Sequence, residues 1–270
     1  MSRRLDGFEA APDARIEIAM QAQSTVEKAV DILFHLHAEP HSCGVTAIGR
    51  RLGLSKSSTH RLLTALSRRG LVEKDDRGRY RPGIGLVALG VGALDREPVV
   101  AAARPVLEAE AEALGETVFL VAARAGRIIV LDKSEGEGFL RAAPRVGSTV
   151  PIHATAVGKL YLAFGDGSVE APAGDLARFS DETITGRAAL EAAVARAAER
   201  GYAENSDEWI PGLSVVAAPV IATASAGRML AAFAVAAPTP RMRSLGHEEM
   251  GRRMMAAAAR VAARFEGVAQ

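Results

Sequence analysis

Residues 45–69 carry the pattern of two short helices joined by a tight turn. Ile48 and Leu52 lie four residues apart, as they would on one face of a helix, and Gly53 can adopt the left-handed conformation that ends it. Ser55 is a good N-cap for a second helix, which is expected to run to about residue 69. A helix, a glycine turn and a second capped helix together predict a helix-turn-helix motif.

Gly49 lies inside the first of these helices, where glycine costs about 1 kcal/mol relative to alanine. This cost is explained if the second helix crosses so closely that no larger side chain fits. The expected core face of the second helix consists of Thr59, Leu62, Leu63 and Leu66.

Elements on each side extend the motif into a small domain. Ser24 and Glu27 form a capping box that begins an earlier helix, which ends near Pro40. After the motif, residues 71–74 and 79–81 flank a loop that contains a glycine, which predicts a β-hairpin. A hairpin in this place is the wing of a winged helix-turn-helix domain. The expected core face of the earlier helix consists of Val26, Val30, Leu33, Phe34 and His37.

The charge of this region differs from that of the remaining chain. The 270 residues have a formal net charge of +1, but residues 24–82 hold 11 Lys and Arg against 6 Asp and Glu. No acidic residue lies between Glu39 and Glu73, whereas six basic residues do. A run of charge is often only a solvated helix face, but one without acids in a nearly neutral protein favours a polyanionic partner.

The motif and its charge together predict double-stranded DNA as the partner. In such domains the first turns of the second helix face base edges in the major groove, and a wing meets the nearby backbone or minor groove. The candidate DNA-contacting residues are therefore Lys56, Ser57, Ser58, Thr59, His60 and Arg61 on the helix and Arg77 on the wing.

Residues that suggest other chemistry form no complete site. His35, His37, His41 and Cys43 are close in sequence, but positions 35 and 37 point to different sides of a helix and no further ligand completes a zinc site. Ser214 lacks the second glycine of a nucleophile elbow. We therefore expect no metal, no cofactor and no catalytic residues, and hence no enzyme.

The sequence also indicates the compartment. One cysteine permits no intrachain disulfide, which suits a reducing cytoplasm. The apolar runs near residues 213–224 and 229–238 are too short to span a bilayer, and residues 1–6 lack the apolar stretch of a secretory signal. We expect a cytoplasmic protein with no membrane contact.

The C-terminal part mixes hairpins with helices. Residues 83–95 have helical spacing and are expected to form a linker helix, and residues 99–114 a second amphipathic helix. Strands are expected near residues 117–123, 128–133, 139–143, 213–221 and 229–236, and helices near 154–164, 187–200 and 245–265. Because strands and helices do not alternate strictly, this order predicts an α+β domain with a largely antiparallel sheet covered by helices.

Residues 147–159 are the most informative segment of this part. A loop of small residues leads into the helix near residue 154, and the free N–H groups at such a helix start favour an anion such as a carboxylate. Small residues equally allow close packing, and the sequence leaves both explanations open.

Many segments of the chain resemble the IclR family of bacterial regulators. Together they cover nearly everything from residue 24 to about residue 265. The resemblance implies a GAF-like effector-binding domain, a homodimer formed through the DNA-binding half and often a dimer of dimers, with repression as the commoner mode. The resembling segments are residues 24–33, 56–63, 70–72, 80–83, 115–118, 151–159, 200–203 and 212–219.

The resemblance also implies an effector pocket. Asn205 stands where relatives often have an acidic residue, and Val215 where a polar or thiol residue can occur. The pocket is therefore expected to suit an acid or amide with an apolar body better than a very small oxoacid. The positions that match the ligand contacts of the family are Phe139, Ala142, Val150, Ala156, Val157, Asn205, Leu213 and Val215.

Four segments are thus expected along the chain. They are a flexible tail (1–22), a winged helix-turn-helix domain (23–84), linker helices (85–114) and a GAF-like effector-binding domain (115–270). The expected function is that of a DNA-binding repressor controlled by a small-molecule effector. Two alternatives remain at this point: a sensor module that acts through protein–protein contacts, and a small-molecule enzyme fused to a winged helix.

Overall fold

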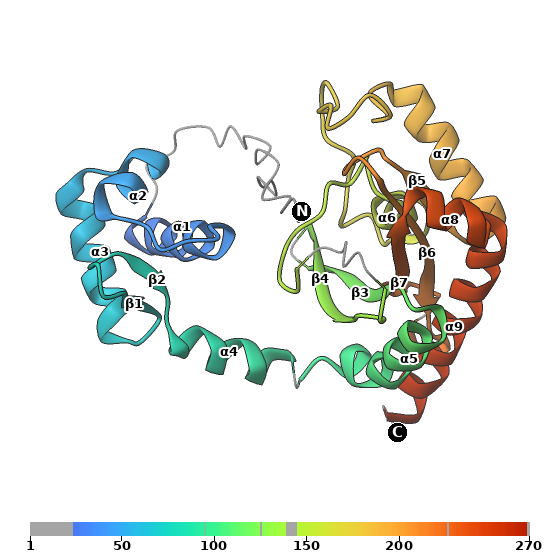
Figure 1. Ribbon diagram of the computed structural model, residues 1–270, viewed down its shortest axis with the longest axis horizontal. Coiled ribbons are helices and arrows are strands. Elements are labelled where there is room, and N and C mark those ends of the chain that lie inside the picture. Colours follow the sequence, from blue (N-terminus) through green and yellow to red (C-terminus); the bar gives the residue numbers. More distant parts are fainter. Residues whose placement is uncertain (1–23, 95, 125, 139–144, 226, 269–270) are drawn as a thin grey trace, which may run out of the picture. The chain divides into compact units, whose positions relative to one another are not determined.

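The computed structural model describes residues 24–94, 96–124, 126–138, 145–225 and 227–268. The chain divides into two compact units, with the boundary between Arg96 and Glu97 (Figure 1).

The N-terminal unit is a winged helix-turn-helix. Three helices, α1 (Thr25–Ala38), α2 (Val45–Leu52) and α3 (Lys56–Arg68), precede an antiparallel hairpin of β1 (Val72–Lys74) and β2 (Tyr80–Pro82), and α4 (Ile84–Leu94) follows. Their shared core contains Ile32, Leu36, Ile48, Leu62, Leu63, Leu66, Val72 and Tyr80. The expected helices and hairpin are confirmed, including the capping box at Ser24.

The expected core face of α1 is wrong for four of its five residues: Leu33 packs against the core, but the others are exposed. Val26, Val30 and Phe34 are 71%, 41% and 56% exposed, whereas Ile32 and Leu36 are buried against the core. Helix α1 carries apolar residues on more than one side, so periodicity alone does not decide which row packs against α3 and β2. The exposed row is left as an apolar stripe on this unit.

The close crossing expected at Gly49 is confirmed. A Cβ atom at this position would lie 2.9 Å from the Leu54 carbonyl oxygen and 2.9 Å from Thr59 Oγ1. Gly53, with φ of 65°, ends α2 in the left-handed conformation, where a side chain would be strained.

The C-terminal unit is built on a five-stranded antiparallel sheet in the order β4-β3-β7-β6-β5. The strands are β3 (Thr117–Arg124), β4 (Arg127–Ser134), β5 (Ala203–Ser206), β6 (Leu213–Ile221) and β7 (Met229–Pro238). A core cluster lies between the sheet and α6 and includes Phe119, Val121, Leu160, Val215 and Ala234. The predicted antiparallel sheet with covering helices is confirmed.

Helices pack against the sheet and against one another (Figure 1). Helices α5 (Pro98–Leu114) and α9 (His247–Val268) pack together and on the strands, while α6 (Ala156–Phe164) contacts β5, β6 and β7. Helix α7 (Arg187–Arg200) packs on α6, a short 3₁₀ turn (Thr223–Ser225) precedes β7, and α8 (Thr239–Leu245) precedes α9.

The C-terminal unit differs from the sequence expectations in two places. The second expected linker helix, α5, is part of the packed C-terminal unit, because Leu107, Ala111 and other residues of its inner face are buried. Strand β5 is an addition to the predicted strands, since its sequence is short and polar and carries little strand signal. The strand expected at residues 139–143 lies outside the described residues.

Replacing Gly49 by Ala should destabilise the N-terminal unit. The new methyl group would force α2 and α3 apart, at a cost of roughly 1–3 kcal/mol. Hydrogen exchange of the α2 and α3 amides in the full chain measures this loss. Gly90→Ala in α4 is the matched control, because its Cβ would meet nothing within 4 Å. If the α2 and α3 amides were equally protected from exchange in both variants, the close helix crossing would not be the reason for glycine at position 49.

Candidate DNA-binding surface and effector pocket

The start of α3 presents polar side chains to solvent. The Ser55 side chain accepts a hydrogen bond from the Ser58 N–H (3.2 Å) and so begins the helix. Ser58 itself is half-buried. Of the predicted DNA-contacting residues on this helix, the exposed ones are Lys56, Ser57, His60 and Arg61.

Thr59 has to be removed from the predicted DNA-contacting set. Its side chain is fully buried, and its hydroxyl donates a hydrogen bond to the Ser55 carbonyl oxygen (2.9 Å). It faces Gly49 at the crossing with α2, so it cannot reach a base. Its assignment to the core face of α3 is confirmed.

The wing is held in shape by one carboxylate. Asp75 accepts hydrogen bonds from the backbone N–H groups of Arg79 (2.8 Å) and Arg77 (2.9 Å), and from Arg79 Nε (3.2 Å). The hydrogen bond from the Arg79 backbone is the largest cause that lowers the pKa of Asp75, so this group stays ionised. Arg77 lies exposed at the turn of the hairpin.

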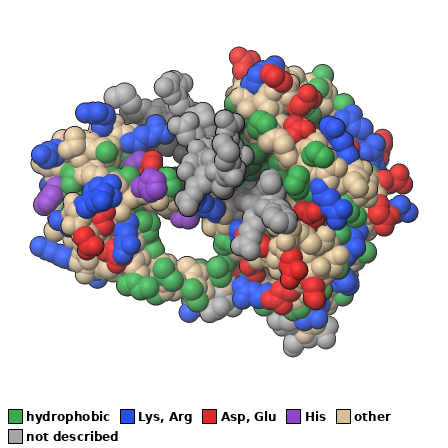
Figure 2. Space-filling view, viewed as in Figure 1, with side chains coloured by type: hydrophobic (Ala, Val, Ile, Leu, Met, Phe, Trp, Pro, Cys, Tyr) green, Lys and Arg blue, Asp and Glu red, His purple; other side chains and the backbone are tan. Residues whose placement is uncertain are grey.

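Other basic side chains lie on the same unit. Arg50 and Arg51 at the end of α2, and Arg68 and Arg69 at the end of α3, are exposed. Lys and Arg side chains are prominent on the visible face of this unit (Figure 2). The unit thus offers exposed cations in addition to those on the first turn of α3, which suits a phosphate backbone.

A small cavity lies in the C-terminal unit at one end of the sheet. Five of the eight positions expected to contact an effector line it: Val150, Val157, Asn205, Leu213 and Val215. Ala156 is buried behind them, and its N–H donates to Asn205 Oδ1 (2.8 Å). Phe139 and Ala142 lie outside the described residues.

Sequence reasoning misses four residues that line this cavity. Trp209 and Ile210 come from the loop between β5 and β6, Phe119 comes from β3, and Thr155 is the N-cap of α6. Trp209 is the only tryptophan of the chain, and a lone large aromatic residue in a glycine-containing loop is a signal that could have found it. Phe119 has no feature in the sequence that distinguishes it from an ordinary strand residue.

The start of α6 already has internal partners for its N–H groups. Ala156 N–H is bound to Asn205, and the Thr155 hydroxyl accepts from Gly158 N–H (3.1 Å). A Cβ at Gly158 would lie 1.8 Å from the Ile152 carbonyl oxygen. Of the two explanations for the small residues here, close packing is confirmed, and an anion would have to compete with Asn205.

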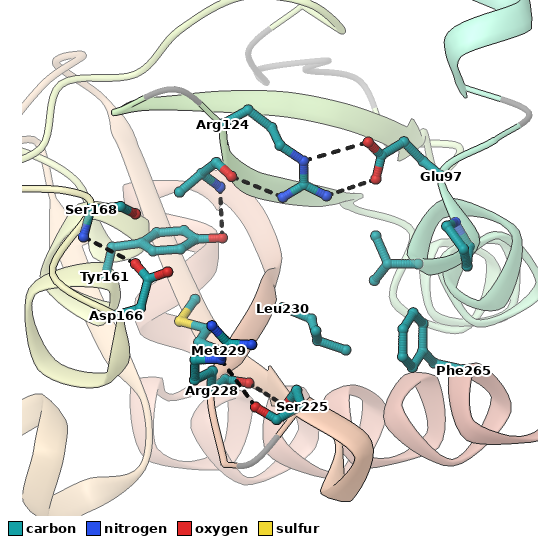
Figure 3. Close-up of a pocket in the computed structure, with 13 residues that line it drawn as sticks. Glu97, Arg124, Tyr161, Asp166, Ser168, Ser225, Arg228, Met229, Leu230 and Phe265 are labelled. Carbon is teal, nitrogen blue, oxygen red and sulfur yellow. Dashed lines mark hydrogen bonds and ion pairs between the residues drawn. The ribbon is translucent and has the colours of Figure 1, made fainter. Parts of the chain in front are cut away.

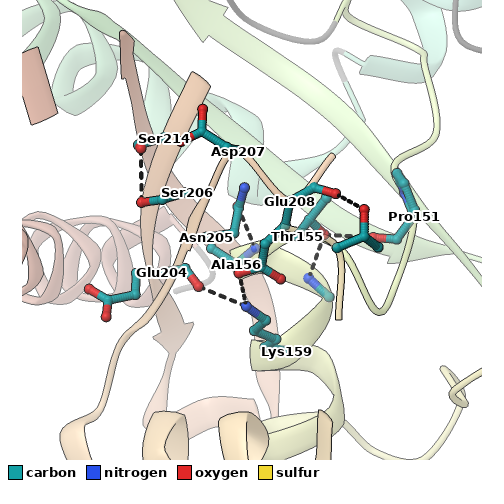
Figure 4. Close-up of polar contacts among 12 residues, drawn as sticks. Pro151, Thr155, Ala156, Lys159, Glu204, Asn205, Ser206, Asp207, Glu208 and Ser214 are labelled. Carbon is teal, nitrogen blue, oxygen red and sulfur yellow. Dashed lines mark hydrogen bonds and ion pairs between the residues drawn. The ribbon is translucent and has the colours of Figure 1, made fainter. Parts of the chain in front are cut away.

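A buried ion pair lies beside the cavity (Figure 4). Lys159 Nζ on α6 donates to Glu208 Oε1 (2.6 Å) and to the Glu204 carbonyl oxygen (3.0 Å). Burial is the main cause that lowers the pKa of Lys159 and raises the pKa of Glu208, so each charge depends on its partner. The pair ties α6 to the loop that carries Trp209.

The cavity is closed in this conformation. Its free volume is about 20 Å³, roughly the space that one water molecule needs. Its lining is almost entirely apolar apart from Asn205 and Thr155. A larger molecule can enter only if side chains or the loop of residues 207–212 move.

The chain joins a winged helix-turn-helix to an α+β domain that contains a closed, mostly apolar pocket. This combination defines a class of protein, the two-domain transcriptional regulators. The family model of the IclR helix-turn-helix domain matches residues 25–76, and that of the C-terminal domain of bacterial IclR transcriptional regulators matches residues 91–263. The chain belongs to the IclR family of bacterial transcriptional regulators.

Individual relatives agree with this assignment. The chain is 32% identical over 225 residues to the HTH-type transcriptional regulator XynR of Escherichia coli (strain K12), covering 81% of this chain and 87% of XynR. An IclR transcriptional regulator from Alicyclobacillus acidocaldarius is 27% identical, with a TM-score of 0.77 over 90% of this chain and 99% of that one. An IclR homolog from Microbacterium hydrocarbonoxydans, complexed with 4-hydroxybenzoate, shares the fold at 21% identity, with a TM-score of 0.76 over 90% of this chain and 100% of that one.

The described residues hold neither a membrane-crossing helix nor a metal-binding cluster. None of the helices in this part of the chain combines the length and apolar character needed to cross a bilayer. No group of three or more His, Cys, Asp or Glu side chains among the same residues is placed to hold a metal ion.

Replacing Lys159 by Met should destabilise the C-terminal unit strongly. The substitution leaves the Glu208 carboxylate buried without its partner, which costs roughly 3–5 kcal/mol. Denaturant unfolding followed by Trp209 fluorescence measures the loss. The double variant Lys159→Met/Glu208→Met should recover much of it, because no charge then stays buried. Equal losses in the single and double variants would show that the pair matters only through its packing.

Proposed function

We propose that this regulator is a sequence-specific repressor whose affinity for operator DNA is controlled by a small acid or amide with an apolar body. The observation that carries the proposal is the first turn of α3, where Lys56, Ser57, His60 and Arg61 are exposed on a helix braced by the Gly49 crossing. Repression is supported by the family resemblance and by a relative, the DNA-binding transcriptional repressor YiaJ of Escherichia coli (strain K12), to which the chain is 30% identical over 218 residues.

The side chains of this turn are suited to reading base edges. Arginine can bind the O6 and N7 atoms of guanine with two hydrogen bonds, and serine can bond to several bases. Arg77, at the tip of the wing, is suited to phosphate or to a narrow minor groove. Recognition would thus come from α3, and most of the sequence-independent affinity from the surrounding arginines.

Two apolar surfaces support a homodimer formed through the N-terminal unit. Val26 and Val30 lie on the exposed stripe of α1. Helix α4 buries none of its side chains against the described residues, although it is strongly apolar. Burying such surfaces against a second copy is favourable at about 25 cal/mol per Å². A dimer of dimers, which the family resemblance implies, extends this proposal. The apolar side chains exposed on α4 are Ile84, Val87, Leu89 and Val91.

The closed cavity is the proposed effector site. Its apolar lining fits an apolar body, and the Asn205 amide can donate to a carboxylate or exchange hydrogen bonds with an amide. Because Asn205 also holds the Ala156 N–H, a ligand that engages Asn205 would act directly on the start of α6. The Microbacterium homolog is complexed with 4-hydroxybenzoate, an acid with an apolar ring, so this compound is a reasonable first probe.

The effector can change DNA affinity only if it binds the DNA-competent and DNA-incompetent arrangements unequally. In a dimeric helix-turn-helix protein the two recognition helices must lie about 34–36 Å apart, or a multiple of this, to meet successive half-sites. The proposed transmitter is the helical stretch of α4 and α5, which joins the two units.

Arg61→Ala and Arg77→Ala should affect DNA binding differently. Arg61→Ala should relax the preference at one base pair in each half-site by about 1–3 kcal/mol, whereas Arg77→Ala should weaken all sequences evenly and lower the salt dependence. Selection of bound duplexes from a random library, followed by titrations at two salt concentrations, separates these effects. Arg243→Ala on α8 is the control, since this exposed arginine belongs to the other unit. If both variants lose affinity without any change in preference, α3 does not read the bases.

Val215→Phe should abolish the effector response and leave basal DNA binding intact. The larger side chain fills the cavity, while the basic surface lies in the other unit. Trp209 emission reports ligand binding, and a DNA titration with and without 4-hydroxybenzoate reports coupling. Val215→Ala enlarges the cavity and should retain the response. A response that persists in Val215→Phe would place the effector elsewhere.

A further inference from the structure

A second and larger cavity lies at the opposite end of the sheet (Figure 3). Its volume is about 310 Å³, at the lower end of the roughly 300–1,000 Å³ that is typical of ligand pockets. It is formed by the end of β3, the start of β7, the first turn of α5, the segment after α6 and Phe265 of α9.

This cavity is separate from the proposed effector site. On β3 the effector site uses Phe119, whereas the second cavity uses Ala123 and Arg124. Helix α6 runs between the two: its N-cap Thr155 lines the first cavity, and Tyr161 lines the second. None of the described residues lines both.

Two arginines line the second cavity, and they differ in their hydrogen bonds. Arg124 is engaged, because its guanidinium donates to both Glu97 carboxylate oxygens (2.7 and 3.4 Å) and to the Ala123 carbonyl oxygen (2.8 Å). Arg228 uses only Nε, which donates to the Ser225 carbonyl oxygen (3.3 Å). Its two terminal nitrogens have no hydrogen-bond partner among the described residues, so they are available donors at the edge of the cavity.

The acidic groups of the lining restrict the charge of a ligand. Glu97 is paired with Arg124, and the Asp166 carboxylate accepts the Ser168 N–H (3.0 Å). The Ser168 side chain is the largest cause that lowers the pKa of Asp166, and the Arg228 guanidinium also lies close enough to contribute to this lowering. Both acids would repel a second negative charge, and Arg228 is the cation of the described lining whose terminal nitrogens have no hydrogen-bond partner there. With two arginines and two acids in the lining, the cavity has no surplus positive charge, so it can take one carboxylate on the Arg228 donors but disfavours a phosphate or a dicarboxylate.

The rest of the lining is apolar or neutral. Pro98, Val99, Leu230 and Phe265 form the apolar part of the lining, and Leu230 and Phe265 are labelled in Figure 3. Tyr161 closes another side: its hydroxyl accepts from the Ala123 N–H (2.9 Å) and donates to the Val121 carbonyl oxygen (3.4 Å). A ligand in this cavity would thus contact the terminal nitrogens of Arg228 and an apolar surface that it could shield from water.

We propose that this cavity is a second ligand site, for a small monocarboxylate with an aromatic or branched aliphatic body. The carboxylate binds the terminal nitrogens of Arg228, and the body packs on Val99, Leu230 and Phe265. The ligand also touches Glu97 and Pro98, where the chain enters α5 after α4. Its binding would therefore act directly on the position of the first turn of α5.

The test is a calorimetric titration of the full chain with benzoate, phenylacetate and cyclohexanecarboxylate, with benzamide as the neutral control. Binding should occur with a Kd of about 1 mM or tighter for at least one acid. Trp209 emission, followed in parallel, reports the effector site alone, because the only tryptophan lines that cavity. Heat that saturates without a matching change in Trp209 emission indicates the second site.

Three variants make the assignment specific. Arg228→Met keeps most of the side-chain length but removes the charge, and should weaken the acid by roughly 10-fold to 100-fold without changing benzamide. Leu230→Ala should weaken it by less, through the apolar wall. Arg243→Met, at an exposed arginine that lines neither cavity, should change nothing. Thermal unfolding of each variant checks that the fold is retained.

The possible outcomes are distinct from those for the proposed function. Acid binding that Arg228→Met weakens and Val215→Phe leaves unchanged supports the second site. The second site is overturned if acid binding follows Trp209 emission and is lost in Val215→Phe but not in Arg228→Met. It is also overturned if none of the three acids shows binding that depends on Arg228. Neither of these overturning results affects the proposal that α3 recognises DNA. If all acid binding follows Trp209 emission, the proposed effector site is also retained.

Discussion

The crossing of α2 over α3 at Gly49 is the contact on which the DNA-binding unit depends. The absence of a side chain lets the Leu54 carbonyl oxygen and the Thr59 hydroxyl approach this position closely. Thr59 points into the core, whereas the nearby residues Ser57, His60 and Arg61 are exposed. The orientation of the candidate reading surface therefore follows from the packing of a single glycine. Protein interiors are packed densely enough that one added methyl group would alter this geometry.

The C-terminal unit depends in a similar way on polar contacts that hold α6 to β5 and to the loop after it. Asn205 binds the first N–H of the helix, and Lys159 forms its buried ion pair with Glu208. Such contacts are costly to break, because each leaves a buried polar group without a partner. They also connect the wall of the proposed effector cavity to α6, the helix that extends toward the second cavity. A change at Asn205 is thus positioned to alter both ends of α6.

Much of the architecture could be predicted from local patterns. Ser24, Ser55 and Gly53 mark helix ends through backbone hydrogen bonding and glycine geometry, which are properties of a few neighbouring residues. The hairpin of the wing and the antiparallel sheet follow from turn residues and strand periodicity. The effector-contact positions come from the family resemblance, and five of them do line one cavity. Trp209 and Phe119 could not be assigned in this way, because membership in a cavity depends on which elements meet and no local pattern encodes that.

The sequence by itself determined the identity of the winged helix-turn-helix, the class of the second domain and the excess of basic residues around α3, because each rests on short-range spacing or on composition. Only the tertiary structure decided which row of α1 is buried and that α5 belongs to the C-terminal unit. It also decided that the start of α6 is already bound by Asn205, and that Arg228 keeps free donors while Arg124 does not. Most of these depend on partners that are distant in the sequence, such as Asn205 for Ala156 and Glu97 for Arg124. A helix with apolar residues on two sides, or an arginine near several acceptors, has no local feature that selects one partner.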